Sequence, residues 1–317
     1  MANTKISFFE RIQNLDRRII YLIVALSIII PLLIPFNSKT YVTEPTENVY
    51  KKIDSYAGQS DKAILLSFSH DASTMAELFP MEVAVLRHCF ERNVKVFTIC
   101  FSPSAKPLMD YAINTAKEDY DVQNGVDYVS FGYKPYGLFL PILLGMGDDI
   151  AKAVETDDQG RKIANLKIME GITNYDDMNL VIDFAASAAV FSWITYARAR
   201  FGVNVAAGIT AVMAADNYPY LQSGQLIGQL SGLKGAAEYE KLVDVFAKGN
   251  NASGTREFSR EVLKDTWLKL DTMDRKYKTA RIGMNAQTVA HVMIIVFILL
   301  GNIGYFIAKK RQENEAN

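Results

Sequence analysis

The sequence predicts an α/β protein with a doubly wound, mostly parallel sheet that lies between N- and C-terminal transmembrane helices. Three observations carry this prediction: short apolar runs of strand length, helical segments that alternate with them, and one long uncharged apolar run near each end. Strands that alternate with helices form βαβ units, and their parallel strands are buried on both faces. An uncharged run of about 20 residues is long enough to cross a bilayer.

The two long apolar runs cover residues 19–36 and residues 289–308. A secretory signal peptide is the alternative for the first run, but its apolar part is only about 7–15 residues long and ends at small residues. The first run is longer and ends in Pro35 and Phe36. We therefore expect two spans, with a kink or an end of the regular helix at Pro31.

Basic residues near the span ends predict the orientation in the membrane. Arg17 and Arg18 precede the first run, and Lys309, Lys310 and Arg311 follow the second. Other basic residues lie on the inner side of both runs, so the prediction depends on the short N-terminal tail. We expect a plasma-membrane protein with both termini cytoplasmic and the main domain extracytoplasmic.

These signals divide the chain into seven parts. In order, they are a cytoplasmic tail (1–18), transmembrane helix 1 (19–36), a connector (37–61), the α/β domain (62–253), a charged stalk helix (254–288), transmembrane helix 2 (289–308) and a second cytoplasmic tail (309–317). The middle part is long enough to bury a substantial core of its own.

The α/β domain contains five runs that predict strands. They cover residues 62–68, 93–101, 125–133, 178–187 and 203–213. In a doubly wound sheet, ligands bind beyond the carboxyl ends of the strands, near the switch in strand order. The candidate ligand-binding residues are therefore those at the strand ends: Ser67, Ser69, His70, Asp71, Ser102 and Asp183.

Two of these candidates have a plainer alternative. Asp71 is placed to cap the following helix, where its carboxylate meets free N–H groups. Asp183 sits at the end of a buried strand and needs a partner there, so a structural hydrogen bond competes with a ligand contact. Ser69, His70 and Asp71 also suggest a catalytic triad, but residues adjacent in sequence seldom converge with triad geometry. No catalytic residue is assigned.

Three glycines at a spacing of four, Gly224, Gly228 and Gly232, stand in the segment YLQSGQLIGQLSGLKGAAEYEKL. On a helix they share one face, and they form a groove for close packing against another backbone. We expect this face to pack within the domain or against an identical helix in another subunit. A phosphate-binding glycine loop is the weakest alternative, because neither usual glycine fingerprint is present.

Other residue classes exclude some partners. A formal net charge of −1 and the lack of like-charge blocks argue against nucleic acid. Three dispersed histidines give no support for a metal site, and no cofactor is expected. Cys89 and Cys100 are either two buried thiols or one disulfide. His88 is expected on the polar side of its helix.

The two spans, the alternating middle domain and the glycine-containing segment together resemble a group of prokaryotic two-span membrane proteins with a Rossmann-like middle domain. The resemblance covers most of the chain. It implies the fold and the anchoring, and it supplies no activity and no functional residues.

The function that these observations favour is non-enzymatic. We expect a membrane-anchored domain that acts as a structural or ligand-sensing subunit of a larger assembly, with the lipid bilayer, copies of itself or other membrane subunits as partners. The alternative is a membrane-bound enzyme that acts on a nucleotide-like or sugar-like substrate. A pocket in which Ser69, His70 and Asp183 converge within hydrogen-bonding distance would favour the enzyme.

Overall fold

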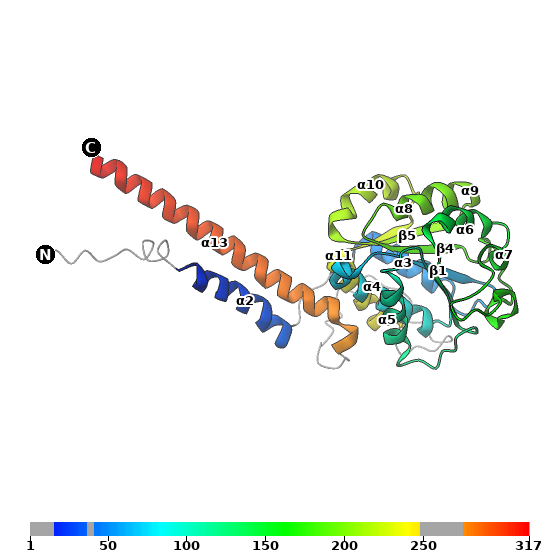
Figure 1. The fold of residues 1–317 in the computed structure, drawn as a ribbon. Helices are drawn as coiled ribbons and strands as arrows, with labels where there is room; N and C mark the ends of the chain where they lie inside the picture. The colour runs from blue at the N-terminus through cyan, green and yellow to red at the C-terminus, as the bar shows by residue number, and fades with distance from the viewer. Residues whose placement is uncertain (1–15, 37–40, 248–274, 317) are drawn as a thin grey trace. The chain divides into compact units, whose positions relative to one another are not determined.

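The computed structural model describes residues 16–36, 41–247 and 275–316 (Figure 1). They belong to two compact units, one formed by residues 1–38 and 282–317 and the other by residues 39–281. Most of the expected stalk, residues 254–274, lies outside the described residues. The larger unit carries the sheet, and the smaller one carries the apolar helices.

The larger unit is built on a six-stranded sheet in which every neighbouring pair is parallel. The strand order is β3-β2-β1-β4-β5-β6. The strands are β1 (Ala63–Ser69), β2 (Lys95–Cys100), β3 (Tyr128–Tyr133), β4 (Leu180–Ala185), β5 (Asn204–Ile209) and β6 (Gly228–Ser231). The predicted parallel α/β sheet is thus confirmed, and the strand order reverses between β1 and β4.

Helices cover both faces of this sheet, which explains why the strands are almost wholly apolar. One face carries α3 (Glu44–Asp54), α4 (Met75–Glu91), α5 (Lys106–Lys117) and α11 (Gly232–Leu242). The other carries α6 (Phe139–Gly145), α7 (Ile150–Val154), α8 (Ala189–Ser192), α9 (Ala199–Phe201) and α10 (Ala214–Gln222). Trp193 is fully buried in the core of this second face.

The smaller unit contains α2 (Arg17–Leu33) and most of α13 (Thr279–Ala316). Among the described residues, one helical stretch, Thr279–Ile307, is long and apolar enough to cross a membrane. Helix α2 has 17 residues and ends two residues after Pro31, so it is at the lower limit of about 17 residues for a span. Within this unit, Asn285 Nδ2 donates to the Phe36 carbonyl.

The prediction of one glycine-faced helix is wrong. Gly224 follows α10, Gly228 begins β6, and Gly232 begins α11. Gly224 and Gly232 have φ values of +71° and +57°, which a right-handed helix interior does not contain. Residues Gly228–Ser231 between them pair with β5, so the three glycines belong to a turn, a strand and a helix start.

The prediction for His88 is also wrong, because its side chain is fully buried. Its ring stacks on Tyr50 with centroids 4.2 Å apart, and its Nδ1 lies 2.8 Å from the Tyr239 hydroxyl. Helix α4 is covered by α3, α5 and α11, so little of it faces solvent. Cys89 and Cys100 are free and buried, as the thiol alternative predicts.

The position of Gly228 gives the first testable prediction. A Cβ at this residue would press on the Pro45 carbonyl oxygen and lie 2.8 Å from Val49 Cγ2, both in α3. We expect Gly228→Ala to lower the free energy of unfolding by about 1–3 kcal/mol through overpacking. Chemical denaturation of the full chain in detergent, followed by tryptophan fluorescence, measures this change.

Gly137→Ala is the matched control, since a Cβ there meets no atom within 4 Å. Equal stability of the two variants would contradict the packing of β6 against α3.

Candidate functional site: a pocket at the strand ends

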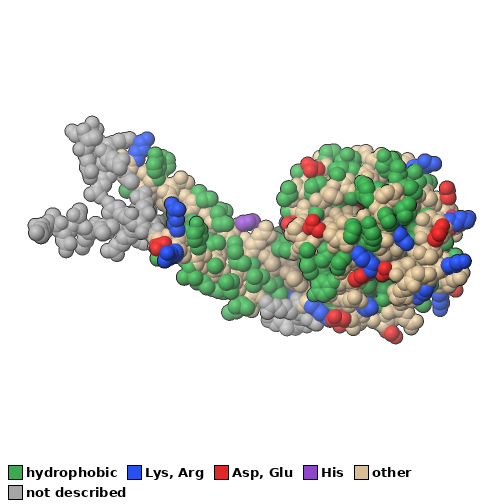
Figure 2. All heavy atoms as spheres, viewed as in Figure 1, with side chains coloured by type: hydrophobic (Ala, Val, Ile, Leu, Met, Phe, Trp, Pro, Cys, Tyr) green, Lys and Arg blue, Asp and Glu red, His purple; other side chains and the backbone are tan. Residues whose placement is uncertain are grey.

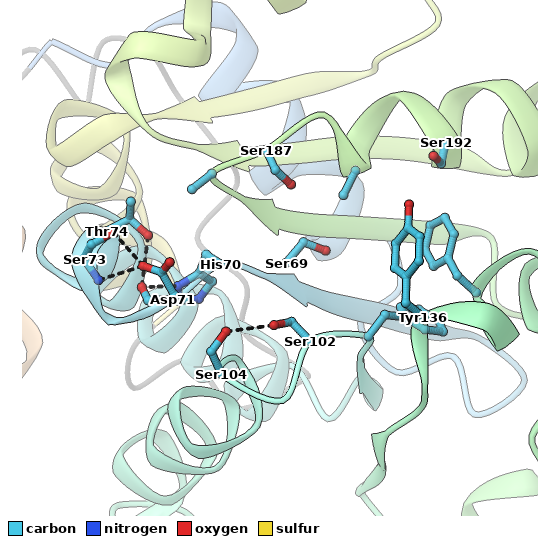
Figure 3. Close-up of a pocket in the computed structure, with 14 residues that line it drawn as sticks. Ser69, His70, Asp71, Ser73, Thr74, Ser102, Ser104, Tyr136, Ser187 and Ser192 are labelled. Carbon is cyan, nitrogen blue, oxygen red and sulfur yellow. Dashed lines mark hydrogen bonds between the residues drawn. The ribbon is translucent and has the colours of Figure 1, made fainter.

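A pocket of about 370 Å³ opens at the carboxyl ends of the strands, next to the switch between β1 and β4 (Figure 3). This volume lies within the range of about 300–1,000 Å³ that small-molecule sites have. The lining comes from the segments after β1, β2, β3 and β4: Ser69, His70, Asp71, Ser73, Thr74, Phe101, Ser102, Ser104, Tyr136, Phe139, Ala186, Ser187, Ala189 and Ser192.

Four of the six candidate residues line this pocket. They are Ser69, His70, Asp71 and Ser102. The other two, Ser67 and Asp183, are fully buried within β1 and β4 and do not line it. The strand-end rule therefore located the pocket, and strand geometry explains the two exceptions, because residues before a strand's end lie inside the sheet.

Asp71 organises the turn between β1 and α4. Its Oδ1 accepts from the Ser73 backbone N–H at 2.8 Å and from the Ser73 hydroxyl at 2.6 Å. The Thr74 hydroxyl donates to the Asp71 carbonyl at 3.1 Å. The Ser73 hydrogen bonds lower the pKa of Asp71, so its exposed carboxylate is ionised at neutral pH. Asp71 thus caps the short 3-10 helix η1 (Ala72–Thr74) that leads into α4, as the capping alternative predicts, whereas Thr74 before α4 makes no side-chain cap of its own.

His70 faces away from Ser69 and contacts Glu82 of α4 through its Nε2. Both side chains are fully buried. Burial alone lowers the pKa of His70, but the Glu82 carboxylate outweighs it and leaves this pKa raised. Burial raises the pKa of Glu82, and His70 offsets only part of this effect. Each group therefore changes the pKa of the other in the protein interior.

Asp183 forms a second buried contact beneath the pocket. The Ser69 hydroxyl donates to its Oδ1 at 2.8 Å. Burial raises the pKa of Asp183 to about 6, although Ser67, Ser69 and His70 each lower it. Asp183 is thus a structural hydrogen-bond acceptor for a residue that lines the pocket.

Ser69, His70 and Asp183, whose convergence would favour an enzyme, do not form one reacting unit. Ser69 is bonded to Asp183, whereas His70 is paired with Glu82. Asp183 is within hydrogen-bonding distance of the Ser69 hydroxyl but is fully buried, so a substrate in the pocket meets Ser69 and not the carboxyl itself. Within the described ranges, no group of three His, Cys, Asp or Glu side chains is placed to hold a metal ion. The arrangement supports binding of a ligand more directly than chemistry on it.

Sequence reasoning missed much of the lining and the partner of His70. The missed residues are Ser73, Thr74, Phe101, Tyr136, Phe139, Ala189, Ser192 and Glu82. Most lining residues in this set stand in the first turns of helices rather than at strand ends. A signal did exist for Glu82, since it is a lone acidic residue within the apolar sequence MEVAVL.

Comparisons of this chain with models of protein families, with curated proteins and with solved structures each found no match.

Asp183 gives a prediction for the pH dependence of stability. Its pKa is about 6 in the folded chain and about 4 in an unfolded one. As pH rises through this window, the unfolded state loses its proton first, so the free energy of unfolding falls by about 3 kcal/mol. Asp183→Asn removes this contribution, and the variant should gain about that much relative to wild type between pH 4 and pH 7.

Denaturant unfolding of both chains across this pH range tests the prediction. Asp148→Asn, at an exposed position, is the control. A constant difference between Asp183→Asn and wild type would show that the carboxyl titrates alike in both states.

Proposed function

We propose that this protein is a membrane-anchored sensor subunit, which binds a small ligand in the strand-end pocket and transmits its presence to the membrane helix α13. The observation that carries this proposal is helix α4. It begins at the pocket, and its other end contacts the buried charge network that holds the first turn of α13.

Helix α4 connects the two places without a break. It starts at Met75, directly after the turn capped by Asp71, and runs for 17 residues, or about 25 Å. Three buried polar residues near its end contact other elements: Arg87 pairs with Asp244, His88 stacks on Tyr50, and Arg92 binds Asp54. A displacement of the turn at the pocket would therefore move several buried polar contacts together.

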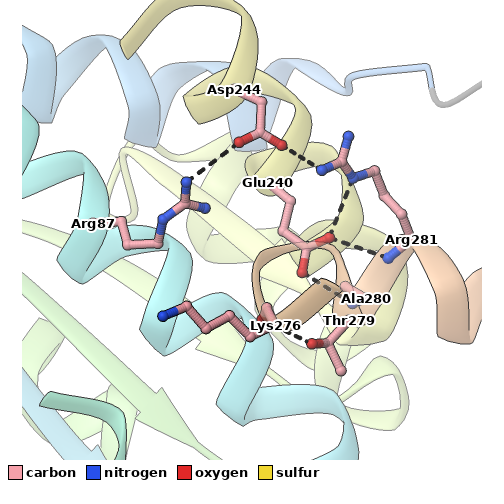
Figure 4. A network of polar contacts seen from close by, with 7 residues as sticks. All are labelled: Arg87, Glu240, Asp244, Lys276, Thr279, Ala280 and Arg281. Carbon is pink, nitrogen blue, oxygen red and sulfur yellow. Dashed lines mark hydrogen bonds and ion pairs between the residues drawn. The ribbon is translucent and has the colours of Figure 1, made fainter. Parts of the chain in front are cut away.

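The charge network joins α4, α11 and α13 (Figure 4). Glu240 accepts from the Ala280 backbone N–H at 2.9 Å and from the Arg281 backbone N–H at 3.1 Å. It thereby caps the N-terminus of α13, where a negative charge is stabilising. Asp244 lies between two arginines, Arg281 and Arg87.

Two contacts of this network are long: Arg87 to Asp244 and Arg281 Nε to Glu240, each at 3.4 Å. Burial raises the pKa of Glu240 to about 7 and also raises that of Asp244, and Arg281 partly offsets both shifts. Removing one member of a buried ion pair costs about 3–5 kcal/mol. A shift of Arg87 that weakens its pair with Asp244 would therefore change the free energy of the contacts at the start of α13.

The membrane part of the proposal rests on the smaller unit. Hydrophobic side chains cover α2 and α13 (Figure 2), and exposed residues such as Leu33, Ile298 and Phe306 have no aqueous role. We propose that both helices span the plasma membrane, with cytoplasmic termini and an extracytoplasmic domain. These apolar faces also suit other membrane subunits or further copies of the chain.

A membrane-bound enzyme is the second candidate. The hydrogen bond between Ser69 and the raised-pKa carboxyl of Asp183 favours it. Full burial of Asp183 opposes it, because the carboxyl reaches a substrate in the pocket only through the Ser69 hydroxyl.

Filling the pocket should change the exchange of backbone hydrogens at the start of α13. The variant Ala189→Trp places an indole in the pocket. We expect it to change the exchange rate at Ala280 and Arg281 by about fivefold or more, because a fivefold change corresponds to the lower end of typical coupling free energies. Hydrogen-exchange mass spectrometry on the full chain in detergent measures this rate. Ala188→Trp is the control, since this neighbour does not line the pocket. Equal exchange in Ala189→Trp, Ala188→Trp and wild type would exclude the coupling.

The proposed orientation predicts where an engineered thiol is accessible. Cys89 and Cys100 are fully buried, so wild type gives a low background with maleimides. Gln159→Cys lies on the exposed surface of the larger unit. A membrane-impermeant maleimide should label this variant in intact cells, whereas a thiol in the C-terminal tail should react only after permeabilisation. The reverse pattern would place the domain in the cytoplasm.

A further inference from the structure

We propose that the pocket takes an uncharged polyhydroxylated molecule, such as a sugar or cyclitol, and rejects phosphate-bearing ligands. This inference deepens the proposed function and rests on the same pocket. It follows from the direction of the hydrogen bonds that the lining already makes.

The wall formed by the β1–α4 turn offers acceptors. A hydroxyl has one hydrogen to donate and two lone pairs. Ser69 donates its hydrogen to Asp183, Ser73 donates to the Asp71 carboxylate, and Thr74 donates to the Asp71 carbonyl. These three hydroxyls can therefore only accept hydrogen bonds from a ligand, and the negative charge of Asp71 lies beside them.

This wall is unfavourable for phosphate. The start of the helix after β1 is where doubly wound folds bind a pyrophosphate, through free N–H groups and a glycine-rich turn. Here Asp71 occupies the Ser73 N–H, and the turn between residues 69 and 74 has no glycine. The pocket lining contains no lysine or arginine, while Asp71 adds a negative charge. A phosphate would meet lone pairs and a carboxylate.

The opposite side of the pocket offers both donors and acceptors. Ser187 and Ser192 belong to the segment after β4, and Tyr136 reaches in from the segment after β3 (Figure 3). Among the described residues, none of these three hydroxyls has a hydrogen-bond partner, so each can donate and accept. Ser102 and Ser104 share one hydrogen bond of 2.7 Å, which leaves one further hydroxyl hydrogen available.

A ligand hydroxyl complements both sides, because it donates to the first wall and also accepts from the second. An ammonium group only donates, and a phosphate at neutral pH mainly accepts. A ligand with several hydroxyls therefore satisfies the whole lining, whereas a group that only donates or only accepts leaves part of it unsatisfied, which is costly.

Aromatic rings provide a surface for the C–H faces of such a molecule. Tyr136 stacks on Phe139 with an interplanar angle of 3° and centroids 5.8 Å apart, and Phe139 meets Phe101 edge-on at 4.5 Å. Tyr136 is 75 % exposed, so its ring is available to a ligand. Apolar rings beside precisely oriented hydroxyls are typical of a site for a compact polar molecule.

Saturation-transfer NMR on the full chain tests this proposal, in a detergent without a sugar headgroup. The neutral probes are glucose, galactose and myo-inositol, and the charged probes are inorganic phosphate and ATP. We expect transfer to at least one neutral probe and none to the charged ones. Tyr136→Phe and Ser192→Ala should each weaken binding about threefold to tenfold, as for the loss of one hydrogen bond.

Two matched variants outside the lining, Tyr133→Phe and Ser223→Ala, should bind like wild type. No transfer to any neutral probe, stronger transfer to a charged probe, or equal losses in the control variants would overturn the assignment. These results are independent of hydrogen exchange at α13 in Ala189→Trp, so the ligand class can fail while the sensor proposal stands.

Discussion

The larger unit depends on two buried carboxylates of α11. One holds the segment where the chain enters this unit, and the other holds the segment where the chain leaves it. Glu238 accepts from the Thr43 backbone N–H at 2.9 Å and from its hydroxyl at 2.7 Å, at the start of α3. Glu240 accepts from the first backbone N–H groups of α13. A carboxylate that loses water needs such donors, because an unpaired buried charge is very costly. One helix thereby fixes the position of the chain both where it enters the unit and where it leaves.

This arrangement explains why the polar residues of α4 are buried. Helix α4 packs between the sheet and α11, so a polar side chain on its outer face meets another element instead of water. Arg87 then lies over the Tyr277 ring at 3.8 Å and reaches Asp244, while Glu82 reaches His70. Each contact has a partner from a different segment. The helix is consequently tied to the pocket at one end and to the anchoring residues at the other.

Features that depend on local sequence could be predicted, whereas features that depend on contacts between distant segments could not. Five strands were predicted because they are apolar runs buried on both faces, a pattern that is local in sequence. The sixth, β6, has four residues and begins with Gly228, and only its pairing with β5 makes it a strand. The strand-end rule located the pocket through Ser69, Asp71 and Ser102. It did not identify Tyr136 or Ser192, whose positions depend on how helices pack over the strand ends.

The polarity of the pocket is itself a consequence of the fold. Parallel strands direct every βα turn to the same edge of the sheet, where each following helix presents free N–H groups that need acceptors. In the turn after β1, the Asp71 carboxylate accepts from the Ser73 backbone N–H. The Ser73 hydroxyl donates to the same carboxylate, and the Thr74 hydroxyl donates to the Asp71 carbonyl. Other doubly wound folds leave the positive end of this helix open to phosphate, whereas here the Asp71 carboxylate occupies it. On the ligand class that we propose, one capping residue makes the strand-end pocket of this doubly wound sheet suit hydroxyls rather than anions, with the strand order unchanged.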